Sequence, residues 1–490
     1  MLSIQKRLTN TFYAILSLPA TSMGFALSVQ ISALSWILST QYNLDIEDVG
    51  LVWAAGPIAG ILGQVIIGII SDNVWFWNGR RRPFILIGGR LAAISLLALP
   101  NIGVISEALG MDGVLGVAII IALTLDLAIN VSFNPTRSII ADVTPEGVER
   151  TKGYTWMQTV SGLFGVLAYG IGAYWDNFVL IYSGVVIVFL FSVIPILFVE
   201  EPRELPGADE ENNNDSDSDD NISVNDASMS EIMKTTQPLW GFLIYAVYAL
   251  YIRLAEVEMG HYYVEYVCLG LTLALIFKTL VQSEATGTKE ERGKIGFKKV
   301  LAAHSFTWIG VQTMFVYMFA FVSYQMPELN DTDMGRVVSW GFLILNAVGA
   351  LFPAFVLEPL AEKFGRVKTH IGSLLLMTLA YVGIAYSGTT PISIYILMAL
   401  AGVGWAATVS LPFAIMSEKV SQRKMGLYMG LFNLAVVLPQ LVSSIGIGKI
   451  IGDAENKTIV FLICAISLGI STLLWFFVKE EMKGEKIATS

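Results

Sequence analysis

Long apolar stretches alternate with short polar loops along most of the chain. An α-helix needs about 20 apolar residues to cross a hydrocarbon layer roughly 30 Å thick. We expect membrane-spanning helices at residues 12–39, 49–71, 83–101, 114–141, 153–174, 178–199, 304–327, 336–358, 367–387, 391–416, 425–448 and 457–478. The pattern therefore predicts an all-α integral membrane protein with 6+6 transmembrane helices in two halves.

Two further apolar segments, 239–255 and 262–280, lie between the halves. They are shorter or more interrupted, and charged residues such as Arg253 and Glu265 lie near their junction. Two extra crossings keep the orientation of the second half, whereas one crossing would invert it. We predict two additional helices in this central region, and the alternative is a pair of helices lying in the membrane interface.

Basic residues gather in alternate loops, which orients the bundle because short loops rich in Lys and Arg stay cytoplasmic. The opposite loops hold few bases, namely Arg336, Lys449 and Lys457. Both termini and the central linker are therefore predicted to face the cytoplasm, in a cell (inner or plasma) membrane. The loop bases that set this orientation are Arg80, Arg81, Arg82, Arg150, Lys152, Lys363, Arg366, Lys368, Lys419, Arg423 and Lys424.

Composition agrees with the membrane class, since 54% of residues are hydrophobic, 14% are charged and the mean hydropathy is +0.64. The formal net charge of −10 arises in residues 200–226, which hold eleven acids and one arginine. We interpret this segment as a solvated, disordered linker rather than as a site for a basic partner. Nucleic-acid binding is not expected, because the bases are spread among short loops.

These patterns divide the chain into five parts. We predict an N-terminal six-helix half at 1–199, an acidic disordered cytoplasmic linker at 200–238, an extra helical hairpin with its connecting segment at 239–303, a C-terminal six-helix half at 304–480 and a cytoplasmic tail at 481–490. Two equivalent halves around a cytoplasmic linker are typical of secondary transporters that work by alternating access.

Residues that support catalysis or metal binding are scarce. The two cysteines, Cys268 and Cys464, lie in apolar stretches and form neither a disulfide framework nor a metal site. The three histidines belong to no HExxH motif, and the chain has no GxSxG or GxxxxGK[ST] sequence. We therefore expect no enzyme activity, no cofactor and no metal.

Two charges, Asp126 and Arg137, interrupt an otherwise apolar stretch at 114–141. A charge near the bilayer centre costs roughly 2.5–3.5 kcal/mol on insertion scales, so it usually faces a bundle interior or an aqueous path. Eleven residues at about 100° each bring the two side chains to one face of a helix, roughly 16 Å apart along its axis. They are expected to share a cavity wall without pairing.

The loop after the second predicted helix carries Gly68, Asp72, Gly79 and the bases Arg80, Arg81 and Arg82, and Gly365 and Arg366 follow the eighth helix at a corresponding position. Glycine permits a sharp turn, aspartate suits a helix N-terminus, and arginine binds carboxylates. We interpret the set as a breakable cytoplasmic latch. The alternative is that the arginines only enforce topology.

With these residues in place, the chain resembles the major facilitator superfamily, whose corresponding loop has a Gly, Asp, Gly, Arg, Arg pattern. Residues 56–85 are similar to the sucrose and disaccharide proton symporters of plants, animals and bacteria, as are residues 126–142 and 430–448. The resemblance implies symport of a sugar with a proton. It also implies that Asp126 couples the proton and contacts sugar, and that Arg137 is its arginine partner.

That role suits a carboxyl group in a partly dehydrated cavity, which can take up a proton near neutral pH and release it when access changes. A purely structural hydrogen-bonding role is the alternative for Asp126. For Arg137 the alternatives are snorkelling and an ion pair, and we favour gating over direct sugar contact.

A sugar site needs amides, hydroxyls and aromatic faces. For each amide, a helix-to-helix hydrogen bond is as plausible as ligand contact. The tryptophans Trp36, Trp53, Trp308 and Trp405, and Tyr324, are expected mainly to pack or to lie at the interface. The substrate-binding candidates are Asp126, Asn130, Gln30, Gln64, Gln158, Gln312, Asn433 and Gln440.

The chain departs from plant members of the resembled family after the seventh helix. Here the segment reads Asp331-Thr332-Asp333-Met334-Gly335-Arg336-Val337, one residue shorter and ending in Val337 instead of an acid. Arg336, a candidate outer-gate residue, therefore needs another acid as partner. These differences weaken the case for sucrose itself, and maltose or a related glucoside is an alternative.

The sequence thus predicts a monomeric transporter whose partners are a small sugar, protons and the lipid bilayer. The alternatives are an uncoupled facilitator, a carrier of another small solute, and a transporter-like receptor without flux.

Overall fold

The structure, a computed structural model, describes residues 7–61, 75–145, 148–202, 229–255, 257, 261–284, 288–420 and 425–480. The chain forms two compact units. Unit 1 comprises residues 1–223 and 327–343, and unit 2 comprises residues 224–326 and 344–490. The predicted disordered linker and the C-terminal tail lie outside the described residues, apart from 200–202 and 229–238.

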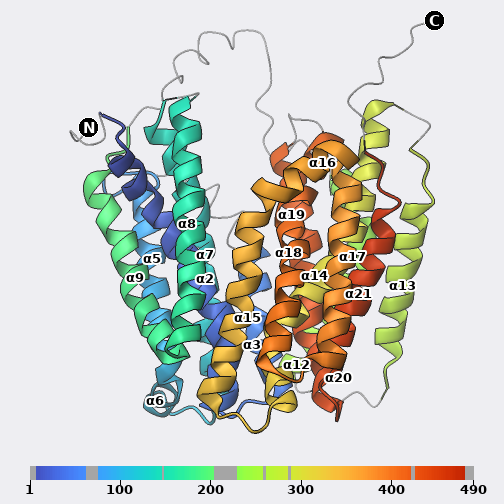
Figure 1. Cartoon of the computed structure of the whole chain (residues 1–490), viewed down its shortest axis with the longest axis horizontal. Helices are drawn as coiled ribbons and strands as arrows, with labels where there is room; N and C mark the ends of the chain where they lie inside the picture. The colour runs from blue at the N-terminus through green and yellow to red at the C-terminus, as the bar shows by residue number, and fades with distance from the viewer. Residues whose placement is uncertain are drawn as a thin grey trace, which may run out of the picture. The chain divides into compact units, whose positions relative to one another are not determined.

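Unit 1 is a bundle of long helices that run roughly along one direction (Figure 1). Short helices η1 (Leu99–Asn101) and α6 (Ile102–Ala108) extend α5 at one end. The other helices are α2 (Asn10–Thr40), α3 (Ile46–Trp53), α5 (Arg82–Ala98), α7 (Leu115–Val143), α8 (Val148–Tyr174) and α9 (Asn177–Phe198).

Unit 2 is likewise helical. Residues 331–343 of α15 (Asp331–Phe352) group with unit 1 and the rest of that helix with unit 2. The other elements are α11 (Met229–Thr235), η3 (Gln237–Leu239), α12 (Trp240–Leu254), α13 (Tyr263–Leu280), α14 (Lys289–Gln325), the π-helical turn η4 (Pro353–Leu357), α16 (Glu358–Phe364), α17 (Arg366–Ser387), α18 (Pro391–Lys419), α19 (Met425–Leu441), the π-helical turn η6 (Val442–Ile447), α20 (Gly448–Asp453) and α21 (Ile459–Trp475).

Polar residues in the loops set where several helices begin. Thr9 and Asp176 accept hydrogen bonds from backbone amides in the first turns of α2 and α9, which satisfies donors that a helix N-terminus leaves open. Thr288 and Glu291 form a reciprocal capping box at α14. This cap starts α14 fifteen residues before the expected crossing at 304, so the expected boundary at 303 and 304 falls inside one continuous helix.

The two units repeat one packing pattern. In unit 1, α2 packs against α8 and α9, and α5 packs against α7 and α9. In unit 2, α14 packs against α19 and α21, and α17 packs against α18 and α21. The helices of the two halves correspond in chain order, so that α2 matches α14 and α9 matches α21. The same pairs of matching helices therefore pack in each half. The predicted all-α fold of two repeated halves is confirmed.

Glycines allow the close helix contacts in the core of unit 1. A Cβ atom on Gly88 would collide with Ser132 of α7, and one on Gly89 would collide with Ser192 of α9. Neighbouring glycines on α5 therefore bring two helices close to its backbone, as small residues do in membrane bundles.

Ten helices in the described part of the chain are long and apolar enough to cross a membrane, in keeping with an integral multi-pass protein. They include α13 of the central region, with 18 residues, whereas α12 has 15. The hairpin of α12 and α13 packs on α14 and η6, with α13 at the periphery of unit 2 (Figure 1).

Candidate functional site

Asp126 is buried at the meeting point of three segments of unit 1. Its side chain lies on α7 and is 6% exposed, and its Oδ2 atom accepts a hydrogen bond of 2.9 Å from Nε2 of Gln30 on α2. A Cβ atom on Gly56 would lie 3.4 Å from both carboxylate oxygens. The backbone after α3 therefore runs close to the carboxylate, at a distance that is ordinary van der Waals contact for a Cβ atom.

This environment stabilises a carboxylate poorly. Among the described residues, Gln30 is the side-chain hydrogen-bond partner of Asp126, and no Lys or Arg pairs with it. A buried charge without a counter-charge is costly, and proton uptake is the usual way to remove that cost. The geometry therefore suits a group that exchanges a proton.

Gln30 has a second feature that fits this role. It is 1% exposed, and its Oε1 atom is buried without a hydrogen-bond partner among the described residues. An amide can turn over and exchange its donor for its acceptor, so a protonated Asp126 could donate to this oxygen. Gln30 can thus accommodate both protonation states of the carboxyl group.

The other candidates of unit 1 are more scattered. Asn130, one helical turn after Asp126, donates from Nδ2 to the backbone oxygen of Asp126 at 2.8 Å. Gln158 is exposed on α8. Gln64 lies outside the described residues. The structure thus brings Gln30 of α2 together with Asp126 and Asn130 of α7, whereas Gln158 lies apart from them on α8.

In unit 2, two candidate amides form a chain of hydrogen bonds. Gln440 donates from Nε2 to Oε1 of the buried Gln312 at 3.1 Å, and Gln312 donates from Nε2 to Oγ of Ser444 at 3.3 Å. Asn433, seven residues before Gln440, is half-buried. The amides on α14 and α19 therefore bond across two helices, while retaining donors and acceptors for a further partner.

A π-helical turn lies beside this amide chain. In η6 the backbone oxygens of Ser443 and Ser444 accept hydrogen bonds from the hydroxyl of Tyr317, at 3.3 and 2.7 Å. Ser443 also shares a 2.7 Å hydroxyl contact with Thr313. π-helical turns frequently occur at functional sites because they free backbone groups from the regular ladder.

The indole N–H groups of the four candidate tryptophans donate hydrogen bonds within the protein. Trp36 donates to the backbone oxygen of Asp331 at 2.7 Å, and Trp53 donates to Ser35 at 2.8 Å. Trp308 donates to His304 at 2.8 Å and Trp405 to Asn346 at 3.2 Å. Tyr324 is exposed.

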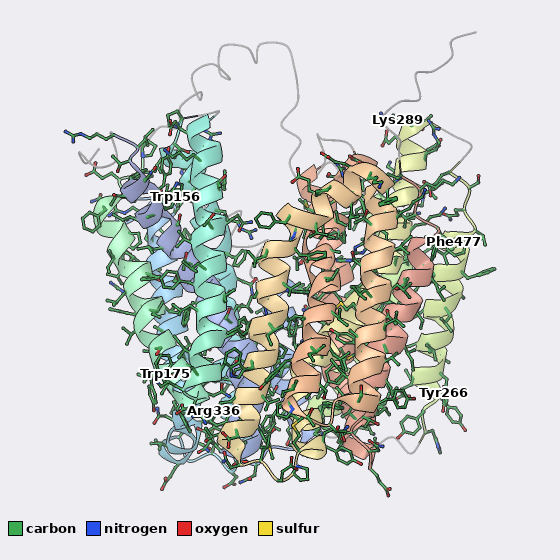
Figure 2. All side chains as sticks on the ribbon, in the orientation of Figure 1. Trp156, Trp175, Tyr266, Lys289, Arg336 and Phe477 are labelled. Carbon is green, nitrogen blue, oxygen red and sulfur yellow. The ribbon has the colours of Figure 1, made fainter. Side chains whose placement is uncertain are left out.

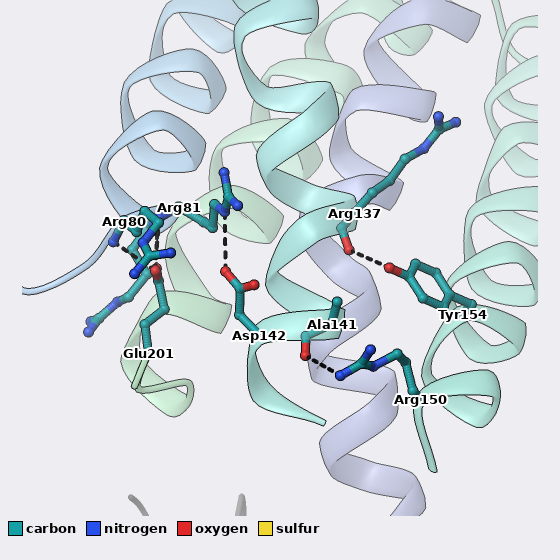
Figure 3. Close-up of polar contacts among 9 residues, drawn as sticks. Arg80, Arg81, Arg137, Ala141, Asp142, Arg150, Tyr154 and Glu201 are labelled. Atoms are coloured by element: carbon teal, nitrogen blue, oxygen red, sulfur yellow. Dashed lines mark hydrogen bonds and ion pairs between the residues drawn. The ribbon is translucent and has the colours of Figure 1, made fainter. Parts of the chain in front are cut away.

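The arginine loop of unit 1 is held by a carboxylate that sequence reasoning missed. Glu201, just beyond α9, accepts hydrogen bonds from the backbone amides of Arg80, Arg81 and Arg82 at 2.7, 2.8 and 2.6 Å (Figure 3). A Cβ atom on Gly79 would lie 2.8 Å from Oε1 of Glu201. The glycine is therefore needed where the loop wraps the carboxylate, at the start of α5.

Unit 2 contains a matching arrangement. Glu480, just beyond α21, accepts from the backbone amides of Arg366 and Val367 at 2.8 and 3.2 Å, at the start of α17. Gly365 has φ of +91°, and a Cβ atom there would collide with Glu480. We call each of these carboxylate contacts a helix clamp, the Glu201 clamp and the Glu480 clamp.

An arginine side chain beside each clamp reaches an acid at the end of the fourth helix of its half. Arg81 pairs with Asp142 of α7 at 3.2 Å, and both side chains are largely buried (Figure 3). Arg366 pairs with Glu418 of α18. The residues predicted to form a latch thus make contacts within each half, while Gly68 and Asp72 of the predicted set lie outside the described residues.

Arg137 points away from this cluster (Figure 3). Its guanidinium lies 4.2 Å from the ring centre of Phe133, and its backbone oxygen accepts from the hydroxyl of Tyr154 at 3.3 Å. The side chain of Arg137 is exposed, and among the residues that the structure describes it has no acidic partner.

Arg336 forms an ion pair with an acid of its own helix. Its Nη1 lies 2.9 Å from Oδ1 of Asp333, one turn earlier, and its Nε donates to the backbone oxygen of Trp175 at 2.7 Å. Figure 2 shows Arg336 and Trp175 near the same end of unit 1.

The missed residues carry a sequence signal. Each half has a pair of acids in sequence after its last helix, Glu200-Glu201 and Glu480-Glu481. One acid of each pair, Glu201 or Glu480, binds the backbone beside a Gly-Arg sequence far earlier in its half. This internal repeat identifies the clamps only when both halves are aligned. No group of three or more potential metal ligands lies together in the part of the chain that the structure describes.

Comparisons with known proteins agree with this architecture. The sequence profile of the Major Facilitator Superfamily matches residues 16–444. The chain is 26% identical over 483 residues to sucrose transport protein SUT2 of Oryza sativa subsp. indica, covering 88% of this chain and 84% of that protein. A 174-residue match, 32% identical, relates it to the general alpha-glucoside permease of Schizosaccharomyces pombe, covering 32% of this chain and 31% of the permease.

Solved structures share the fold. The inward-open xylose transporter XylE from E. coli superposes with a TM-score of 0.61 at 16% identity, covering 97% of both chains. A mutant of the nucleoside transporter NupG gives a TM-score of 0.63 at 13% identity, covering 95% of this chain and 98% of that one. These relatives and neighbours are transporters, which confirms the prediction that the chain is not an enzyme.

Proposed function

The chain belongs to the Major Facilitator Superfamily, and on that premise we propose that it carries a sugar across the membrane together with a proton. The sugar is a disaccharide or another α-glucoside such as sucrose or maltose, as the names of the relatives suggest. Both termini lie in the cytoplasm, and the protein works as a monomer by alternating access.

The observation that carries the proposal is the buried carboxyl group of Asp126. Its one side-chain partner among the described residues is the neutral amide of Gln30, at 2.9 Å. A proton is therefore the available counter-charge, and its binding removes the cost of a buried carboxylate. Coupling follows if the loaded carrier changes access readily only when Asp126 is protonated.

Sugar hydroxyls are well suited to the same surroundings. A hydroxyl can donate to ionised Asp126 or to the unpartnered Oε1 of Gln30. In unit 2 we assign sugar contacts to the amides of Gln312, Gln440 and Asn433. Arg137 supplies a positive charge that assists gating, since it has no acidic partner among the described residues.

The test is uptake by full-length protein reconstituted in vesicles, with a panel of labelled disaccharides offered with and without an inward proton gradient. Proton symport predicts that the gradient drives accumulation of one or more sugars. In Asp126→Asn the side chain keeps its shape and an oxygen that accepts from Gln30, but it has no proton to exchange. We expect this variant to lose accumulation while retaining sugar exchange.

Asp112→Asn is the matched control, because Asp112 is exposed outside the helices and its substitution should leave accumulation unchanged. Accumulation by Asp126→Asn equal to that of the unmodified protein would refute coupling through this residue. Equilibration that ignores the gradient would instead indicate an uncoupled facilitator. Saturable binding without flux would indicate a receptor.

A further inference from the structure

Unit 2 contains a cavity that the transport proposal does not use. Its volume is about 630 Å³, within the roughly 300–1,000 Å³ typical of small-molecule sites. The hairpin of α12 and α13 forms one wall, and α14, η6 and α20 form the other. Much of the lining is apolar, including Phe242, Leu269, Phe306, Ile447 and Ile450.

Close contacts hold the hairpin in place beside this cavity. A Cβ atom on Gly241 would collide with Thr272, so α12 and α13 touch at that point. A Cβ atom on Gly446 would collide with the Tyr245 ring, so α12 also rests directly on η6. The cavity is therefore built by packed helices.

Charged and amphipathic residues gather at one end of the cavity. Lys449 and Asp453 lie on α20, and Glu265 lies in the first turn of α13. The Lys449 ammonium is 5.7 Å from the ring centre of Tyr262. Tyr266 extends outward at the end of unit 2 opposite Lys289 (Figure 2), as tyrosines do at membrane interfaces.

The charges at this end have unused bonding capacity. Neither Lys449 nor Asp453 forms an ion pair within the described residues. The hydroxyl of Tyr248 lies close enough to Glu265 to interact with it, and the Oε2 atom of Glu265 is buried without a well-aligned hydrogen-bond donor among the same residues. A buried carboxylate oxygen in this condition favours a ligand that brings a donor or a positive charge.

These features select among ligand classes. The apolar lining and the exposed Leu269 and Ile450 suit a hydrocarbon chain rather than a sugar. The mouth has one cation, Lys449, and two carboxylates, Glu265 and Asp453. A purely anionic head group would be repelled by this excess of acids, whereas a head group with both a phosphate and an ammonium finds partners for each.

We propose that the cavity binds a phospholipid with a primary-amine head group, of the phosphatidylethanolamine class. An acyl chain fills the apolar part between α13 and η6. Lys449 binds the phosphate, and Glu265 and Asp453 accept hydrogen bonds from the ammonium. Choline has no N–H to donate, so the site distinguishes the two zwitterionic lipids.

The test is native mass spectrometry of the full-length protein in mild detergent, titrated with dioleoyl phosphatidylethanolamine, phosphatidylcholine or phosphatidylglycerol. We expect the ethanolamine lipid to bind at about tenfold lower concentration than either of the others. A tenfold change corresponds to about 1.4 kcal/mol, close to one hydrogen bond with a charged group.

Three variants separate the parts of the proposal. Glu265→Gln should remove the preference for ethanolamine over choline, and Lys449→Gln should weaken both lipids about tenfold, since both carry the phosphate. Leu269→Trp should fill the cavity and weaken all three lipids. Leu273→Trp, exposed one turn further along α13 and outside the lining, is its matched control.

Equal binding of the three lipids by the unmodified protein would overturn the proposal, as would an unchanged ethanolamine preference in Glu265→Gln. Leu269→Trp and Leu273→Trp with the same lipid affinity would show that the chain lies elsewhere. Each variant is first required to elute as a single species, so that loss of binding is not loss of fold.

Discussion

Removing the carboxylate of the Glu201 clamp should destabilise unit 1. Glu201 is 9% exposed and accepts three backbone hydrogen bonds of 2.6–2.8 Å, from Arg80, Arg81 and Arg82. The residue preceding α5, Arg81, gives no side-chain cap, so Glu201 takes over the capping of that helix. Glu201→Ala leaves these donors without their acceptor.

The size of the effect follows from those three bonds. A hydrogen bond to a charged group contributes about 1.5–3 kcal/mol, so the gross loss for three bonds is roughly 4.5–9 kcal/mol. Water reaches the exposed rim of the loop and the removed carboxylate no longer has to be dehydrated, which reduces the net loss. We expect Glu201→Ala to lower the free energy of unfolding by about 2–4 kcal/mol.

The measurement is equilibrium unfolding of the purified full-length protein by SDS in mixed micelles, followed by tryptophan fluorescence. Glu107→Ala, on the exposed face of α6, is the control and should change the free energy by less than about 0.5 kcal/mol. If Glu201→Ala unfolds like this control, the clamp does not stabilise α5 and the reasoning fails.

A double-mutant cycle makes the assignment specific. Gly79→Ala places a methyl group 2.8 Å from Oε1 of Glu201 and should also destabilise the protein. Part of that clash disappears when Glu201 is already alanine, so the two changes together should cost less than their sum. Strict additivity would show that the glycine and the carboxylate act independently.

Two further substitutions test packing and local order in unit 2. A Cβ atom on Gly404 of α18 would collide with Met377 of α17, so Gly404→Ala should lower the free energy of unfolding by about 1–3 kcal/mol. Gly372→Ala is the control and should change it little, because the space around that Cβ is open. Equal losses of free energy for the two variants in SDS unfolding would contradict this. Lys294 of α14 pairs with Glu231 of α11 at 2.8 Å, so Lys294→Gln should speed amide hydrogen exchange in α11, and unchanged exchange would show that the pair does not order this helix.

The sequence predicts helix positions well where hydrophobicity alone decides them. The expected starts at 178, 367 and 391 lie within one residue of α9, α17 and α18. The helix α14 begins fifteen residues before the expected crossing at 304, because Thr288 and Glu291 cap a polar helix that continues into the apolar one. Hydropathy predicts which residues lie in the hydrocarbon layer, whereas capping residues predict where a helix begins.

The sequence identifies the individual residues of the candidate site, but it does not predict which of them are in contact. Asp126 stands out because a carboxyl group is costly in an apolar stretch, and Gln30 stands out as an amide in another. Nothing in their spacing predicts that they touch, since 96 residues separate them. Their roles in proton and sugar binding remain predictions for the transport assay.

The two halves share their clamps but not their titratable group. Asp142 of α7 and Glu418 of α18 occupy matching positions, as do the interior prolines Pro135 and Pro412. Aligned on either pair, the position of Asp126 falls on Gly402 or Val403, which carry no charge. Carboxylates at helix ends hold each half together, so repetition serves stability there. A single buried carboxyl group suffices to exchange a proton, and a second would add another dehydrated charge without adding coupling. The asymmetry at Asp126 therefore agrees with the proposal that a single carboxyl group of this two-part fold exchanges the proton.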